Sequence, residues 1–145
     1  MINRKVKNAT AITYDGITFR SHIELKVYKA LVDAGYKPQY EPDKIQLLES
    51  FRPKRVWYLD GEPQTTKTGA KKGKTVIGKT YTPDFKLVVN GITVYIEVKG
   101  HPNDVYPITR KMFLKWIDEQ EEEIIFSEIH TMRGLNKFID KLKLL

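Results

Sequence analysis

Residues 81–99 read YTPDFKLVVNGITVYIEVK, two largely apolar runs separated by Asn90-Gly91. Both runs are rich in β-branched and aromatic side chains, which favour strands. Asn-Gly between two such runs is the strongest short-range signal for a β-hairpin, because its turn needs two residues that tolerate a positive φ. The sequence therefore predicts one antiparallel hairpin, with strands over Tyr81–Val89 and Ile92–Lys99.

Charged side chains gather at one end of this hairpin. Strand side chains alternate between two faces, so Glu97 and Lys99 share a face and lie roughly 6.5–7 Å apart along it. The opposite face carries Ile92, Val94, Ile96 and Val98. The turn brings Asp84, which follows Pro83, across from the charged pair. Because Pro cannot donate to the ladder, it favours a local distortion at which the Asp84 carboxylate can point away from the sheet.

These residue types suit phosphodiester hydrolysis. Two close carboxylates can hold Mg²⁺, which prefers oxygen ligands and keeps several waters. The cation stabilises charge on the phosphate and lowers the pKa of a bound water, and a nearby ammonium orients that water or offsets developing charge. We therefore predict Asp84 and Glu97 as metal ligands, Lys99 as a catalytic residue, and Glu24 as a further catalytic residue and metal ligand.

Two ordinary roles compete with this interpretation. Charged residues two apart on a strand usually form the solvent face of an antiparallel sheet, which would account for Glu97 and Lys99. Glu24 lies three residues after Ser21, so its carboxylate would also fit the capping box of a helix that begins there.

The rest of the chain alternates between helical and extended patterns. Apolar residues at Ile23, Val27 and Leu31 have helical spacing, and Gly35 ends that helix. Further elements are expected as an extended segment over 38–48, a strand over 56–59, a mobile loop or hairpin tip over 60–78, a helix over 107–120, a strand over 123–129 and a helix over 135–144. This order predicts a mixed α/β fold with a central mixed sheet flanked by helices (αβββαβ). The sequence also predicts a single domain over 1–145, with a long basic loop insertion at about 60–79.

Composition limits the classes of protein. With 145 residues, 41% of them hydrophobic, the chain is long enough to bury a core. The absence of Cys excludes disulfides, thiolate metal sites and thiol catalysis. No apolar run reaches the roughly 20 residues that span a bilayer, and the N-terminus lacks a signal-peptide core. The sequence thus predicts a soluble, cytoplasmic protein.

Positive charge is concentrated in one segment. Between Arg52 and Lys79 stand eight basic residues and only two acidic ones, so most of the net charge of +7 lies there. Such a segment is an electrostatic footprint for polyanions, nucleic acid first among them. A solvated loop is the alternative. The candidate DNA contacts are Arg20, Lys67, Lys71, Lys72, Lys74 and Lys79.

Several motifs together resemble a known nuclease superfamily. Thr82-Pro83-Asp84-Phe85 followed by Glu97-Val98-Lys99-Gly100 is similar to the PD-(D/E)XK signature. Phe19-Arg20-Ser21-His22-Ile23-Glu24-Leu25-Lys26-Val27 resembles the first-helix motif of the phage endonuclease I family of Holliday-junction resolvases. The similarity continues through Gly35-Tyr36-Lys37, Tyr40-Glu41 and Gly91-Ile92, and covers most of residues 17–100.

The resemblance implies a restriction-endonuclease-like core and a homodimer that nicks branched DNA. It places the family's carboxylates on Glu24, Asp84 and Glu97 and its lysine on Lys99, with Mg²⁺ as cofactor and Mn²⁺ able to replace it. It also fits a phage-encoded protein that acts in a bacterial host. The basic insertion between Arg52 and Lys79 has no counterpart in the family, which leaves the geometry of the substrate open.

The sequence leaves other functions and other candidate residues open. A restriction-type or nicking endonuclease would need a dedicated element for reading base edges, and none is evident. A non-catalytic DNA-binding module would leave the carboxylates and Lys99 unexplained.

The three histidines lack metal-ligand spacing and are expected at the surface, with His101 nearest the site. Phe113 and Trp116 are expected in the core, Arg110 and Lys111 on a solvated helix face, and Trp57 and Tyr58 fit either core or base stacking.

Overall fold

The computed structural model describes residues 10–65, 73–99 and 105–145. The chain divides into two compact units. One comprises Met1–Asp43 and Thr82–Leu145, and the other, called here the ribbon unit, comprises Lys44–Tyr81. The basic insertion expected at about 60–79 belongs to the ribbon unit.

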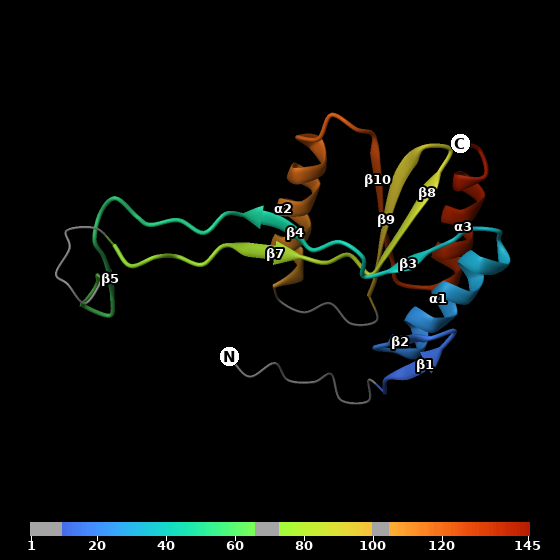
Figure 1. Cartoon of the computed structure of the whole chain (residues 1–145), viewed down its shortest axis with the longest axis horizontal. Helices are drawn as coiled ribbons and strands as arrows, with labels where there is room; N and C mark the ends of the chain where they lie inside the picture. The colour runs from blue at the N-terminus through green and yellow to red at the C-terminus, as the bar shows by residue number, and fades with distance from the viewer. Residues whose placement is uncertain (1–9, 66–72, 100–104) are drawn as a thin grey trace. The chain divides into compact units, whose positions relative to one another are not determined.

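A four-stranded mixed sheet forms the centre of the first unit (Figure 1). Its strands are β3 (Gln39–Tyr40), β8 (Phe85–Val89), β9 (Ile92–Val98) and β10 (Ile124–Ile129), in the order β10-β9-β8-β3. The β9–β10 pair is parallel, whereas β8 pairs antiparallel with both β9 and β3. The parallel pair is joined through a helix, because parallel neighbours need a long crossover connection.

Helices lie on both sides of this sheet (Figure 1). They are α1 (His22–Asp33), α2 (Tyr106–Asp118) and α3 (Met132–Leu142). The crossover helix α2 covers one face, and α1 and α3 cover the other. A small hairpin of β1 (Ile12–Tyr14) and β2 (Ile17–Phe19) precedes α1. The mixed α/β class, with a mixed sheet flanked by helices, is confirmed.

The predicted hairpin is present, but its first strand is shorter than expected. Asn90 and Gly91 have φ values of 51° and 80°, as the two-residue turn requires. Its first strand begins at Phe85 rather than at Tyr81, which instead ends β7 (Lys79–Tyr81). Pro83 has no N–H to donate, and the N–H of Asp84 is bonded to a side chain, so pairing with β9 starts only at Phe85.

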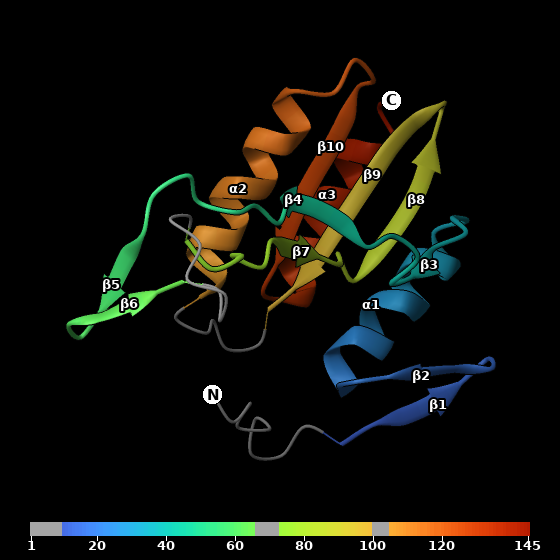
Figure 2. The same ribbon diagram turned by 60° about the vertical axis from the view of Figure 1, so that its left-hand side comes forward.

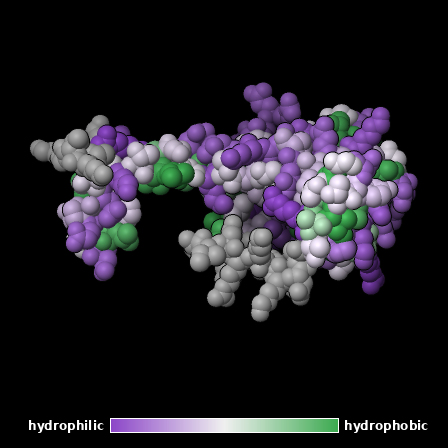
Figure 3. Space-filling view, turned by 60° about the horizontal axis from the view of Figure 1, so that its bottom comes forward, coloured by the Kyte–Doolittle hydropathy of each residue, from purple (hydrophilic) through white to green (hydrophobic). Residues whose placement is uncertain are grey.

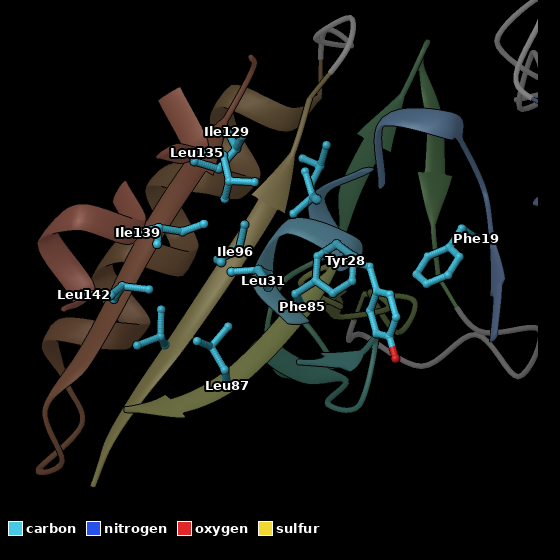
Figure 4. Packing of buried hydrophobic residues seen from close by; sticks show 13 residues of the cluster. Phe19, Tyr28, Leu31, Phe85, Leu87, Ile96, Ile129, Leu135, Ile139 and Leu142 are labelled. Atoms are coloured by element: carbon cyan, nitrogen blue, oxygen red, sulfur yellow. The ribbon is translucent and has the colours of Figure 1, made fainter. Parts of the chain in front are cut away.

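The main core lies between the sheet and the helices α1 and α3 (Figure 4). Phe85, Val94 and Ile96 point into it from the strands and are fully buried. Each such side chain contributes about 1.5–3 kcal/mol relative to leaving it exposed. On the other face, the Tyr95 and Phe126 rings contact Phe113 of α2, at centroid distances of 5.8 and 5.1 Å. Both faces of β9 are therefore covered.

Helix boundaries follow the capping residues. Ser21 caps α1 as predicted, and Gly35 follows that helix with a φ of 92°. The last helix begins at Met132 rather than at the expected Leu135, because the Thr131 hydroxyl accepts a hydrogen bond from the Gly134 N–H at 3.0 Å. The expected helix over 107–120 and strand over 123–129 are present with slightly different ends.

The ribbon unit, taken by itself, is a chain of antiparallel pairings (Figure 2). Strand β4 (Ile45–Leu48) pairs with β7, Phe51 pairs with Val76, and β5 (Trp57–Leu59) pairs with β6 (Glu62–Gln64) around Asp60-Gly61. The described part of 60–78 is thus a hydrogen-bonded ribbon with a hairpin at its tip, so of the two alternatives predicted there, a mobile loop or a hairpin tip, the hairpin is the one present. Asp60-Gly61, with φ values of 48° and 81°, is the turn signal that favours the hairpin over the loop.

Candidate active site

Asp84 and Glu97 meet where β8 and β9 begin to pair. The Asp84 backbone N–H donates to Glu97 Oε2 at 3.3 Å, and the Val98 N–H donates to Asp84 Oδ2 at 2.7 Å. Only 7% and 5% of these two residues are exposed. Two side-chain bonds therefore replace the ladder beside Pro83, and they fix both carboxylates. The alternative that Glu97 belongs to a solvent face is wrong.

Lys99 lies beside Glu97, on the same face of β9. Its Nζ is 3.0 Å from Glu97 Oε1 and 4.0 Å from the centre of the Tyr106 ring. Its backbone N–H donates to the Ile129 carbonyl at 2.8 Å, so the chain still follows β10 beyond the end of β9. The ammonium is thus held between a carboxylate and an aromatic face.

Glu24 contributes a third buried carboxylate from the first turn of α1. Its N–H donates to the Ser21 hydroxyl at 3.3 Å, but its carboxylate accepts a 2.5 Å hydrogen bond from the Tyr40 hydroxyl. The reciprocal half of a capping box is therefore not formed, and that alternative role of the Glu24 carboxylate is wrong. The Glu41 N–H donates to the Asp84 carbonyl at 2.8 Å, which links the Tyr40 segment to Asp84.

Arg20 is an exposed cation whose charge interacts with that of Glu24. Its guanidinium pairs with Glu41 at 2.9 Å, and 72% of its side chain is exposed. Desolvation opposes its charge, but Glu41, Tyr40, Glu24 and Asp84 together raise the pKa of Arg20. Arg20 thus adds positive potential beside the buried acids while staying open to solvent.

Three buried acids lie close together in this site. Glu24, Asp84 and Glu97, called here the carboxylate cluster, are all buried. Burial, and next the charge of Glu97, raise the pKa of Asp84 to about 8, and Glu24 adds to this effect. The Val98 N–H and Lys99 act in the opposite direction without cancelling it. Burial and the bond to Glu24 also raise the pKa of Tyr40, which keeps its hydroxyl a donor.

This pKa shift predicts a pH-dependent stability in the absence of divalent cations. The folded-state pKa of Asp84 lies above the unfolded value of 3.8. The proton on Asp84 therefore stabilises the folded chain fully below about pH 4, and this contribution is lost as pH rises through about 8. We expect Asp84→Asn to raise the free energy of unfolding relative to wild type at pH 9 and much less at pH 5, in denaturant titrations with EDTA. Asp118→Asn, at an exposed site on α2, is the control, and an equal effect of Asp84→Asn at both pH values would contradict the shift.

Another acid, Glu128, lies beside Glu97 on the same face of the sheet and was not predicted from the sequence. It is the register partner of Glu97 across the parallel β9–β10 pair. Arg110 Nη1 lies 3.0 Å from its carboxylate, and His130 Nε2 lies 2.5 Å from it. Burial opposes ionisation, but hydrogen bonds from His130, Tyr106 and Arg110 lower the pKa of Glu128. Glu128 therefore has an ion pair of its own with Arg110, which does not lie on a solvated face as expected.

The other candidate residues are more dispersed. Lys74 and Lys79 belong to the ribbon unit, whereas Lys67, Lys71, Lys72 and His101 lie outside the described residues. His22 is exposed, as predicted.

In the described ranges, no three His, Asp or Glu side chains form a preassembled metal-binding group. No helix in those ranges has the length and apolar character needed to cross a membrane.

Comparison with known proteins identifies a family. Residues 4–131 match the model of the family described as "Protein of unknown function (DUF1064)", and the chain belongs to this family because the match covers most of its length. No curated protein and no solved structure matches the chain significantly.

Proposed function

We propose that this member of the DUF1064 family is a metal-dependent DNA endonuclease with a restriction-endonuclease-like core. Glu24, Asp84 and Glu97 would bind Mg²⁺, and Lys99 would act beside them. The observation that supports this most is the meeting of three buried carboxylates beside Lys99, where burial, and next the charge of Glu97, raise the pKa of Asp84 to about 8. Burying charges without neutralising them destabilises a fold, so such a cluster is expected where function requires it.

The donor set suits a hard divalent cation. The cluster offers carboxylate oxygens, the ligand type that Mg²⁺ prefers, and the chain has no thiolate that would select a softer metal. The carboxylates are not preassembled as a chelate, so binding would include rearrangement of their side chains. When bound, the cation would stabilise negative charge on the phosphate and promote ionisation of the attacking water.

The surrounding residues have separate tasks in this proposal. Val98 and Asp84, through their N–H groups, hold the two hairpin carboxylates in place. Tyr40 holds the Glu24 carboxylate by a hydrogen bond. The Lys99 ammonium, 3.0 Å from Glu97, would orient the attacking water or stabilise charge that develops on the phosphate.

DNA is the proposed substrate because of the charge of the ribbon unit. Basic residues outnumber acidic residues nine to three within Lys44–Tyr81. Polyanion binding releases counterions from the phosphate backbone, which is the main source of affinity for nucleic acid. The resemblance to junction resolvases adds a preference for branched DNA and a homodimer to the proposal.

A panel of DNA structures tests the proposal. The whole chain is incubated with linear, nicked, forked and four-way DNAs of matched length, with Mg²⁺ or with EDTA, and the products are mapped. We expect nicks near the branch points with Mg²⁺ and none with EDTA. Binding without cleavage in any condition would favour a non-catalytic DNA-binding module instead.

Exchanging the cation gives a second expected result. Mn²⁺ should support cleavage, whereas Ca²⁺ should support DNA binding but little turnover, because its larger and more variable coordination positions water poorly. Initial cleavage rates at equal concentrations of the three cations measure this. Cleavage that persists at the same rate in EDTA would contradict a metal-dependent mechanism.

A further inference from the structure

Three large side chains are exposed on the hairpin of β5 and β6, called here the tip hairpin. Trp57, Tyr58 and Leu59 are 42%, 66% and 60% exposed. A two-stranded ribbon has no second layer of its own against which to bury such side chains. Hydrophobic surface on the ribbon unit is visible as green areas in Figure 3. Adjacent exposed apolar residues of this size mark an interaction surface.

Backbone hydrogen bonds join the segments that flank the tip hairpin. The Lys74 N–H donates to the Gln64 carbonyl at 2.8 Å, and the Gly73 N–H donates to the Pro53 carbonyl at 3.1 Å. A Cβ at Gly73 would lie 2.8 Å from the Arg55 carbonyl oxygen. The backbone segments around Gly73 and Arg55 therefore approach each other too closely for a side chain at position 73. The three exposed side chains are therefore presented by a hydrogen-bonded ribbon.

Charge distinguishes between the possible occupants of this surface. Lys54, Arg55 and Lys74 are exposed in the ribbon unit, which has an excess of six basic residues. A second copy of the ribbon unit would carry the same excess positive charge and would be repelled. An apolar partner would offer these cations no opposite charge. A polyanion with flat apolar groups complements both features, and nucleic acid combines phosphates with base faces.

We infer that the tip hairpin recognises DNA in which base stacking is interrupted, as at a nick, fork or four-way junction. Trp57 and Leu59, which share one face of β5, contact one exposed base, Tyr58 on the opposite face stacks on another, and the neighbouring cations bind the backbone. In an intact duplex every base face is covered, and inserting a side chain requires unstacking. At an interruption a base face is already exposed, so the same contacts form more readily. The inference rests on the proposed function for its choice of DNA.

Binding measurements with the whole chain in EDTA test this inference. Dissociation constants are compared for a four-way junction, a nicked duplex and a linear duplex of equal length. We expect wild type to prefer the interrupted DNAs, and Tyr58→Ser/Leu59→Ser to weaken binding to them by about tenfold or more while binding to linear duplex changes little. Tyr58→Phe should bind as wild type does. Val88→Ser, which alters a comparably exposed apolar residue of the first unit (62%), is the control.

Three outcomes would overturn the inference. They are an unchanged preference in the double variant, an equal loss on linear and interrupted DNA, and a loss of self-association that accounts for the weaker binding. Cleavage by wild type with Mg²⁺ is measured separately. Cleavage without any preference for interrupted DNA would refute the inference but leave the proposed function in place. Preferential binding that depends on Tyr58 and Leu59, without cleavage, would refute the proposed function but support the inference.

Discussion

Asp84→Asn and Glu97→Gln should each reduce DNA cleavage by roughly 10³-fold or more, since a catalytic cation contributes several kcal/mol to the transition state. Each substitution removes one negative charge from the proposed cation site. In the Asp84→Asn variant the side-chain amide oxygen can still accept the Val98 N–H, so the local fold should persist. DNA binding should persist too, or tighten, because a charge that repels phosphate is lost. Single-turnover rates at saturating DNA and Mg²⁺ measure the effect on chemistry.

The matched control for these variants is an exposed carboxylate. Asp118→Asn and Glu119→Gln change the same functional groups at the exposed end of α2 and should cleave as wild type does. Cleavage by Asp84→Asn or Glu97→Gln at close to the wild-type rate would exclude these residues as the catalytic centre. Melting temperatures of all four variants separate a loss of chemistry from a loss of folding.

Lys99→Ala should reduce the cleavage rate by about 10²–10³-fold, the usual effect of removing one charge-stabilising donor. The ammonium lies 3.0 Å from Glu97 Oε1, so the variant also leaves Glu97 without this partner. Lys99→Arg keeps the charge and should recover part of the rate if charge alone matters. Single-turnover rates over a range of Mg²⁺ concentrations distinguish weaker cation binding from slower chemistry.

Lys111→Ala is the control for this variant. Lys111 is exposed on α2, and its removal should leave the rate unchanged. If Lys99→Ala cleaves at the wild-type rate under saturating Mg²⁺, Lys99 only stabilises the buried Glu97 and has no catalytic role.

Local signals predicted the central hairpin and the meeting of its two carboxylates. Asn90-Gly91 defines the turn, and strand periodicity then places Glu97 and Lys99 on one face. Once the turn is known, pairing across it brings Asp84 to Glu97, as the structure shows. The cap at Ser21 likewise defined the start of α1 and the place of Glu24 in its first turn.

Contacts between distant parts of the chain could not be predicted in this way. Nothing near Tyr40 in the sequence indicates that its hydroxyl binds Glu24, since that contact depends on how β3 joins the edge of the sheet. The position of Glu128 beside Glu97 depends on the register of a parallel pair formed across α2. The solvent-face expectation failed for a related reason: α2 covers the face of β9 that a simple hairpin would expose to water.

Cation binding by the protein without DNA tests the central proposal most directly. The metal-free chain is titrated with Mn²⁺, and free Mn²⁺ is followed by electron paramagnetic resonance at pH 8. We predict saturable binding of at least one ion per chain in wild type, and its loss in Asp84→Asn and in Glu97→Gln. No saturable binding in wild type, or equal binding by wild type and both variants, would contradict a cation site in the carboxylate cluster.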